Sequence, residues 1–425
     1  MTGVTVIGLD DTDSRERGMC TTYVAATLAD AVRAAGGSVE RRLLVRLNPA
    51  VEHKTRGNAA LALHTDLPVD RALDLASDHL ALAETDDPRT NPGVVVAPGR
   101  PGEVPDAVAA FARQAVRELL DADEAVALAA NANYETAHAG NGRGRVGALA
   151  AVGAWRAFDD WTYERISYRE RERWGTDREV DRESVRVAAD EGYPAVWDTV
   201  DRGEGYPVCV PRTPCPVLHG IRGDDADAVR RVAAAIDAEP VARRALFVTN
   251  QGTDAHLRSA GRVSDLREGG SFRVDGCVAG APETREGGHV FFELGDDTGE
   301  IECAAFEPTK RFRDRVRALR VGDRLTVCGE VSDGTLKLEK FAVREPVTSE
   351  RATPDCPDCG RSMASAGAGQ GYRCRDCGTS APGKVERPVE RDLEPGWYEV
   401  PPCARRHIAK PLVRGGFDAP THPER

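Results

Sequence analysis

The stretch VIGLDDTDSRERGMCTTYVAATLADAV, residues 6–32, consists of an apolar strand, an acidic turn and an apolar helix. Its turn holds three carboxylates, Asp10, Asp11 and Asp13. Carboxylates this close repel one another, so in folded proteins they usually share a divalent cation or polarise a nucleophile. A solvated turn that caps the helix is the competing interpretation, because Asp and Ser also favour turns and N-caps.

The remainder of the first half alternates strand-like and helix-like runs up to a glycine-rich turn near residue 140. This alternation is typical of an α/β domain, which we expect over residues 1–155. Residues 156–268 contain a strand, turn, helix and strand pattern that indicates part of an α+β domain.

The composition bounds the class of protein. A chain of 425 residues is too long for one ordinary core. No apolar run is long enough to cross a membrane, and the start MTGVTVIGLDD lacks the basic region of a signal peptide, so we expect a cytoplasmic protein. Only six of the 57 basic residues are Lys and the formal net charge is -12. This balance is typical of proteins adapted to concentrated salt, and we expect a halophilic archaeal source.

Residues 269–346 change character. They contain five strand-like runs with one helix, opened by Pro308, between the third and the fourth. This order predicts an OB-fold, a small β-barrel that often binds oligonucleotides. A barrel that serves only as a spacer is the alternative.

Two CxxC pairs follow the predicted barrel, Cys356 with Cys359 and Cys374 with Cys377. Fourteen residues separate the pairs, and a glycine after each pair admits the tight turn that brings four thiolates to one tetrahedral Zn²⁺. The spacing predicts a zinc ribbon over residues 350–384. Because all four ligands are protein sulfur, the Zn²⁺ is expected to be structural.

Basic residues gather in and after this ribbon. We expect residues 385–425 to form a basic C-terminal tail, and we predict that it contacts the phosphate backbone of a nucleic acid together with the ribbon. A merely solvated tail is the alternative. The predicted RNA-contacting residues are Arg373, Arg375, Arg405, Arg406 and Lys410.

Two further stretches of the first half have the composition of phosphate-binding loops. RLNPAVEHKTRGNAA, residues 46–60, combines basic side chains with glycine and asparagine, and NGRGRVG, residues 141–147, is rich in glycine. Neither is a Walker A motif, and the second is equally well explained as a packing turn. Together with the acidic turn they supply what phosphoryl transfer requires. The candidate ATP-binding residues are Arg46, Lys54, Arg56, Gly57, Asn58, Gly142 and Gly144.

Several of these motifs are known in combination. GLDDTDSRERGMCTTY, RLNPAVEHKTRGNAA, GRGRVGALAAVGA, TPCPVLHGIRG, GGHVFFE and YEVPPCARRHIAKPL together resemble the archaeal 2-agmatinylcytidine synthetase of the minor isoleucine tRNA, over nearly the whole chain. The resemblance implies a kinase-like α/β domain, a ferredoxin-like domain, an OB-fold and a zinc ribbon. It also implies the use of ATP and agmatine to convert cytidine 34 of the CAU anticodon into agmatidine, which lets the tRNA read AUA.

The resemblance also implies residue roles. It makes the acidic turn the catalytic centre and Thr21 an autophosphorylated residue, although a longer turn at residues 15–17 leaves Thr22 as a competing assignment. The implied chemistry phosphorylates the cytosine O2, after which agmatine attacks C2, with Mg²⁺ held by the acids and Lys54 and Arg56 neutralising the triphosphate. We expect the agmatine pocket near residues 215–223.

Two other functions compete with this one. A haloacid-dehalogenase-like phosphatase also places a DxD pair after its first strand, and Asp11 and Asp13 fit that pair. A non-catalytic RNA-binding protein built on the barrel and ribbon is the second alternative. The sequence leaves the oligomeric state open.

Overall fold

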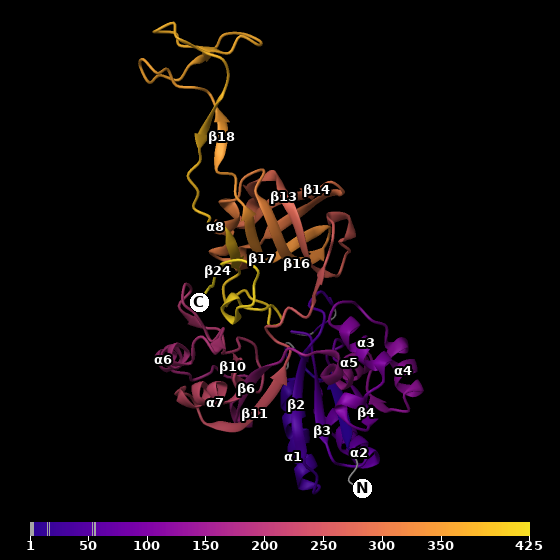
Figure 1. Cartoon of the computed structure of the whole chain (residues 1–425). Coiled ribbons are helices and arrows are strands. Elements are labelled where there is room, and N and C mark those ends of the chain that lie inside the picture. Colours follow the sequence, from indigo (N-terminus) through magenta and orange to yellow (C-terminus); the bar gives the residue numbers. More distant parts are fainter. Residues whose placement is uncertain (1–3, 15, 17, 53, 55–56) are drawn as a thin grey trace.

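A computed structural model describes residues 4–14, 16, 18–52, 54 and 57–425 of the chain. Figure 1 shows an α/β body, a barrel beside it, and a thin extended part at the far end of the barrel. No helix within these described ranges is long and apolar enough to cross a membrane.

A single mixed sheet of nine strands runs through the body, in the order β5-β4-β1-β3-β2-β11-β6-β10-β7. Parallel pairing of β2 with β11, in which Leu43 faces Val248, joins the first half of the chain to the second. The two predicted domains therefore share one continuous sheet. Its strands are β1 Thr5–Asp10, β2 Val39–Arg46, β3 Ala59–Thr65, β4 Gly93–Pro98, β5 Glu135–His138, β6 Thr162–Arg169, β7 Val196–Trp197, β10 Val217–Gly223 and β11 Val241–Thr249.

Helices cover both faces of the first half of this sheet. α1 (Thr21–Ala34) and α2 (Val69–Leu80) pack on one face, and α3 (Asp106–Ala115), α4 (Ala122–Asn131) and α5 (Gly144–Ala157) pack on the other. β1 is a continuous apolar run because it is buried on both sides. α6 (Arg182–Gly192) and α7 (Ala226–Ala235) pack on each other and cover the second half of the sheet.

Glycines let α5 cross β1 at backbone distance. A Cβ atom added to Gly8 would lie 2.1 Å from the Ala148 carbonyl oxygen, and one added to Gly147 would lie 1.9 Å from Asp10 Oδ2. An added Cβ on Gly144 would lie 2.6 Å from the Gly93 nitrogen. The glycine-rich stretch is thus a packing device that brings the start of α5 against the acidic turn.

The barrel has the expected OB-fold architecture. Its strands β13 (Ser271–Thr284), β14 (Val290–Asp296), β15 (Gly299–Ala305), β16 (Arg324–Ser332) and β17 (Thr335–Glu345) close through the parallel pair β15–β17, with α8 (Phe312–Arg317) after the third strand. Within the body, short strands β8 (Val200–Asp201) and β9 (Tyr206–Pro207) pair with each other between β7 and β10. The short strand β12 (Leu257–Ser259) lies between body and barrel in the chain.

The C-terminal segment 396–425 is part of the folded molecule. β23 (Gly396–Glu399) pairs with β17 of the barrel, and β24 (Thr421–His422) pairs with β23. Trp397 and Leu412 are buried in a small core with Cys328. The prediction of a separate basic tail over 385–425 is therefore wrong for these residues, because the apolar side chains between the basic ones anchor the segment.

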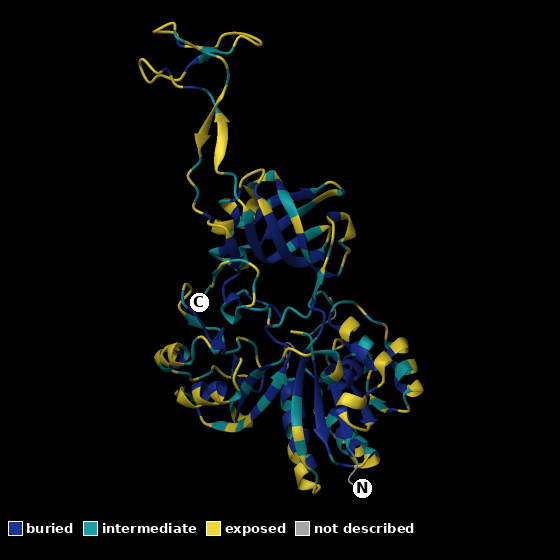
Figure 2. Cartoon of the chain, in the orientation of Figure 1, coloured by how far each residue is buried: buried dark blue, intermediate teal, exposed yellow. Residues whose placement is uncertain are grey.

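The zinc ribbon is the thin part at the top of Figure 1. It is attached by the two-stranded stem of β18 (Ser349–Ala352) and β22 (Val385–Pro388), and it contains β19 (Ala364–Ser365), β20 (Tyr372–Arg373) and β21 (Ser380–Ala381). Figure 2 shows that most of it is exposed. So small a core requires a metal to hold the fold.

Candidate active site and zinc centre

A cavity of about 520 Å³ lies where the two halves of the body meet, and it is lined by both halves and by one C-terminal residue, His407. It brings together most of the residues predicted for catalysis and ATP binding, whose roles stay predictions. Gly142 does not line it, and Arg56 lies outside the described residues. The predicted residues in its lining are Asp10, Asp11, Asp13, Thr21, Arg46, Lys54, Gly57, Asn58 and Gly144.

The acidic turn presents Asp10 and Asp11 in different surroundings. Asp10 is the last residue of β1, and burial, followed by the charges of Asp11 and Asp13, raises its pKa well above the ordinary value. Asp11 has a positive φ of 59°, and its Oδ2 accepts hydrogen bonds from Arg143 Nε at 3.0 Å and from the Asn91 backbone nitrogen at 3.1 Å. Burial raises the pKa of Asp11 although Arg143 opposes the shift.

The three carboxylates do not converge on one point. Across the described part of the chain, four cysteines form the one group of metal-ligating side chains whose ligand atoms lie within 4.8 Å of one another. Asp11 is paired with Arg143, and the expectation that the acids hold Mg²⁺ stays a prediction. Mg²⁺ in phosphoryl-transfer sites is usually held by one or two carboxylates and by substrate phosphates. A buried carboxylate surrounded by acids, as Asp10 is, fits that donor set.

Thr21 and Thr22 begin α1, and both line the cavity. Cys20 precedes them in an extended conformation, and its Sγ lies 3.1 Å from Thr22 Oγ1. The N-terminus of α1 therefore borders the cavity, and helix N-termini favour an added phosphate. Either threonine is placed to accept one.

The loop 46–58 lines the cavity with cations. Burial lowers the pKa of Arg46, whose guanidinium donates to the Gly57 carbonyl and to Gln251 Oε1, each at 3.3 Å. Lys54 Nζ contacts the Pro49 carbonyl. Asn58, with a φ of 42°, closes the loop by donating to the Asn48 carbonyl at 2.8 Å.

Three residues that line the cavity were not among the predicted site residues. Glu164 and Arg222 are register partners on β6 and β10, and His407 comes from the C-terminal segment. Burial, and then the charges of Arg46 and Arg222, holds the pKa of His407 well below its usual range. Arg46 Nε and Arg222 Nη1 are buried without a hydrogen-bond partner among the described residues. Such N–H groups suit phosphate oxygens.

A sequence signal for these residues exists but is weak. Glu164 and Arg222 are charged residues at positions where a buried strand normally has apolar ones. His407 stands in a basic run whose composition predicts a contact with the phosphate backbone of a nucleic acid, away from the predicted active site.

The predicted zinc ligands converge. Cys359 Sγ lies 3.7 Å from Cys374 Sγ, which matches the spacing of about 3.8 Å that tetrahedral Zn–S bonds require. Gly360 and Gly378, with φ of 70° and 72°, donate to the carbonyls of Cys356 and Cys374 at 2.8 and 3.1 Å. With Cys377 as the fourth thiolate, these residues fit a structural Zn²⁺.

The predicted RNA contacts separate into two groups. Arg373 and Arg375 are exposed on the ribbon. Arg405 is buried between Asp198, which it contacts closely, and Glu399, at 2.8 Å. Its prediction as a phosphate contact is wrong for this structure, because two buried carboxylates already neutralise it. Arg406 pairs with Glu330 and Glu339, and Lys410 is half-buried against Phe417.

Comparison with known proteins matches this architecture from end to end. Family profiles for the TiaS TCKD domain, the TiaS FLD domain, an OB-fold nucleic acid binding domain and the TiaS C-terminal zinc ribbon domain match residues 6–141, 142–256, 259–339 and 353–393. The isoleucine-tRNA 2-agmatinylcytidine synthetase TiaS of Haloquadratum walsbyi is 54% identical, covering 99% of this chain and 100% of the relative. The chain belongs to the isoleucine-tRNA 2-agmatinylcytidine synthetase family.

Solved structures of this synthetase family agree with the assignment. A crystal structure of TiaS with its isoleucine tRNA and ATP is 42% identical with a TM-score of 0.91, and one of TiaS with the tRNA, AMPCPP and agmatine is 40% identical with a TM-score of 0.88. Each covers 100% of both chains. Membership confirms the predicted fold and an ATP-dependent ligase, and it contradicts the phosphatase and the non-catalytic alternatives.

Proposed function

We propose that this chain uses ATP and agmatine to convert cytidine 34 of the minor isoleucine tRNA with a CAU anticodon into 2-agmatinylcytidine. The observation that carries the proposal is the single cavity, which collects an acidic turn, two threonines at a helix N-terminus and several cations from distant parts of the chain. Relatives that match the whole chain form complexes with an isoleucine tRNA, an ATP analogue and agmatine, which supports the same substrates here.

The chemistry explains why a phosphoryl-transfer site serves a ligase. An amine cannot displace the cytosine O2 directly, because oxygen in that form is a very poor leaving group. Transfer of a phosphoryl group to O2 creates a good leaving group. The agmatine nitrogen then attacks C2, the C2–O bond breaks, and the oxygen leaves as part of inorganic phosphate while the amine loses a proton.

The cavity residues divide this work. Asp10 and Asp13 are the proposed Mg²⁺ ligands, and a bound Mg²⁺ would neutralise developing charge on the phosphates. Arg46, Lys54 and Arg222 neutralise the phosphates directly. Thr21 is the proposed residue that is phosphorylated. The target base has to leave the anticodon stack to reach them.

The amine substrate is placed by the other half of the cavity. Cys215, Val217 and Gly220, from the stretch 215–223 proposed for the agmatine pocket, line this half. Glu164 faces the same space and is held by a 2.6 Å hydrogen bond from Gln251 Nε2. Its carboxylate complements a cationic amine or guanidinium.

Mass analysis of the wobble nucleoside tests the proposal. After incubation of the CAU transcript with ATP and agmatine, we expect cytidine 34 to gain the mass of agmatine less one water. Asp13→Asn should abolish this gain, whereas Asp74→Asn, at an exposed position of α2, should leave it intact. An unmodified cytidine 34 with the parental chain would contradict the proposal.

The phosphorylated residue is assigned by a matched pair of variants. Thr21→Val is expected to lose protein-bound phosphate after incubation with labelled ATP, and Thr22→Val to keep it. The reverse result would move the assignment to Thr22, and undiminished label on both variants would place the acceptor elsewhere.

A further inference from the structure

One wall of the cavity is an irregular segment, residues 211–217. Pro211, Thr213, Cys215 and Val217, which alternate along it, line the cavity. The described residues 211–216 belong to no strand or helix, although the Pro216 carbonyl accepts from the Arg169 backbone nitrogen at 2.8 Å beside the β6–β10 ladder. Something else must satisfy the other carbonyl groups and hold the wall in shape.

A single side chain does this for four alternate carbonyls. Arg178 Nη1 donates to the Pro211 carbonyl at 2.8 Å, and Arg178 Nε donates to the Val217 carbonyl at 2.9 Å. Its Nη2 donates to the Thr213 carbonyl at 3.0 Å and to the Cys215 carbonyl at 3.3 Å, and lies 3.1 Å from Cys215 Sγ. The rigid fork of a guanidinium carries five N–H donors, and here all three nitrogens bind one segment.

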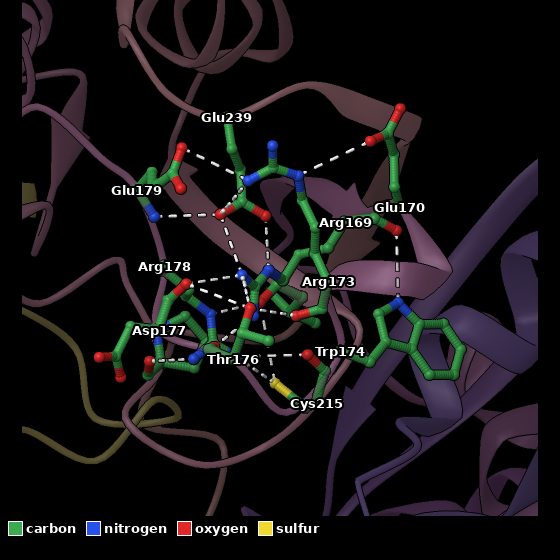
Figure 3. Close-up of polar contacts among 12 residues, drawn as sticks. Arg169, Glu170, Arg173, Trp174, Thr176, Asp177, Arg178, Glu179, Cys215 and Glu239 are labelled. Atoms are coloured by element: carbon green, nitrogen blue, oxygen red, sulfur yellow. Dashed lines mark hydrogen bonds and ion pairs between the residues drawn. The ribbon is translucent and has the colours of Figure 1, made fainter.

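The residues on either side of Arg178 are each held by a hydrogen bond. The buried pair Arg169–Glu239, with Nε to Oε1 at 2.6 Å, anchors the loop: Arg169 Nη2 donates to the Asp177 carbonyl at 2.9 Å. Glu239 Oε2 accepts from the Glu179 backbone nitrogen at 3.0 Å. Figure 3 shows Arg178 between these anchors, with its guanidinium directed toward Cys215. The Arg178 guanidinium therefore reaches the wall from a backbone that is anchored on both sides.

The wall also borders the acidic turn. A Cβ atom added to Gly18 would meet the Pro214 carbonyl oxygen at 3.7 Å and the Cys215 Cα at 4.0 Å. Gly18 lies between the acids and Thr21. A substrate bound against the wall is thus close to the proposed phosphoryl-transfer residues. Of the wall, Cys215 and Val217 also belong to the apolar core that β1 and α1 share with several other strands.

We propose that Arg178 is a positioning residue for the amine substrate: it fixes the wall 211–217 and thereby the place at which agmatine meets the activated base. This inference rests on the proposed function. It separates the two substrates, because the hydrogen bonds of Arg178 go to the wall, whereas Asp10 is positioned by β1 and Thr21 by α1.

The test compares Arg178→Met, Arg178→Lys and a control, Arg171→Met, at an exposed position of the same loop. In Arg178→Met we expect KM for agmatine to rise about tenfold or more, because a misplaced wall misplaces the amine. Labelling of Thr21 by ATP should change less than about threefold, because the wall contributes only Cys215 and Val217 to the described core around α1 and β1. Arg178→Lys should be intermediate, since one ammonium cannot span four carbonyls. Arg171→Met should match the parent.

A second measurement, the accessibility of Cys215, does not depend on agmatine. Iodoacetamide modification of Cys215, followed by peptide mass analysis, is expected to be faster in Arg178→Met than in the parent and the control. If the parent forms no agmatidine, the proposed function fails, while faster Cys215 labelling still supports the positioning role. Unchanged labelling overturns that role, as does an unchanged KM for agmatine. An equal loss of Thr21 phosphorylation and amine use would also overturn it, since that pattern indicates general unfolding.

Discussion

The zinc ribbon and the C-terminal segment 396–425 both carry clusters of arginine, but their surroundings are opposite. Arg373 and Arg375 of the ribbon are exposed, and within the described ranges no carboxylate lies within ion-pair distance of either. Arg405 of the C-terminal segment is enclosed with Asp198 and Glu399. The ribbon thus offers free positive charge to a partner, whereas the segment uses its charge to join barrel and body.

The difference assigns separate tasks to two neighbouring stretches. His407, two residues beyond Arg405, lines the cavity, and its carbonyl accepts from the Gly252 backbone nitrogen at 2.8 Å. The segment therefore helps to build the reaction site. The ribbon, joined through a two-stranded stem, is placed to hold nucleic acid away from it.

The largest expected effect is on stability. Arg405→Met should lower the free energy of unfolding by about 3–5 kcal/mol, because it removes the buried cation between Asp198 and Glu399 and leaves Asp198 only its longer pair with Arg222 at 3.8 Å. Arg375→Met should change it by less than about 0.5 kcal/mol, as at other exposed sites. Urea unfolding followed by tryptophan fluorescence measures both. Equal stability of the two variants would contradict the comparison.

The second effect appears in acid. Burial raises the pKa of Glu339, but the charges of His256, Arg406 and Lys340 outweigh it and hold the pKa at about 2, against 4.5 in the unfolded chain. The carboxylate contributes stability above pH 4.5, which is lost as the pH falls toward 2 and amounts to about 3 kcal/mol at most.

Glu339→Gln should remove this dependence. The stability gap between parent and variant is expected to be constant above pH 5 and to narrow between pH 4.5 and 2. Urea midpoints at a series of pH values measure it. A gap independent of pH would show that Glu339 is not held ionised by these cations.

The third effect concerns RNA capture. Replacing residues 350–387 by a short Gly-Ser linker removes the ribbon but keeps β23, β24 and His407, because Ser349 and Pro388 are paired neighbours at the base of the stem. We expect tRNA affinity to fall on the order of 100-fold, because the cations of the ribbon no longer neutralise phosphates, with Thr21 phosphorylation unchanged. Filter binding measures the tRNA affinity. An unchanged affinity would contradict the proposal that the ribbon holds the tRNA. Chelation of zinc from the full chain should reproduce the loss.

The smallest expected effect is on the salt dependence of tRNA binding. It distinguishes arginines of the ribbon that pair with a carboxylate from those that do not. Arg373→Ala with Arg375→Ala should reduce the slope of log affinity for tRNA against log salt by about 1 for each phosphate that is no longer neutralised. Arg361→Ala is the matched control, because Arg361 already pairs with Asp376 at 2.5 Å. Equal slopes for the double variant and the control would refute the role of Arg373 and Arg375.

Local patterns predicted most of the fold. The CxxC spacing located the zinc ligands, and the strand, turn and helix of residues 6–32 occur as expected, with α1 beginning at Thr21. These features depend on residues close in sequence. The equal alternative for NGRGRVG, a packing turn, describes Gly144 and Gly147 better than an anion loop, because close helix crossing and phosphate binding both demand glycine.

Long-range pairing explains what the sequence did not predict. β11 joins β2 across about two hundred residues, and only this pairing encloses the cavity between two halves of one sheet. Arg405 pairs with Asp198 of the body and with Glu399 at the edge of the barrel. A run of basic residues has the same composition whether or not carboxylates from distant parts of the chain pair with it. The surroundings of Arg405 could therefore not be predicted from composition.

Transfer of an oxygen label tests the central claim most directly. The minor isoleucine tRNA, carrying ¹⁸O at O2 of cytidine 34, is incubated with ATP, agmatine and this chain, and the released inorganic phosphate is analysed by mass. Phosphorylation of O2 followed by attack at C2 predicts that the ¹⁸O atom appears in phosphate, one for each agmatidine formed. Agmatidine formed without ¹⁸O in the phosphate would contradict the account.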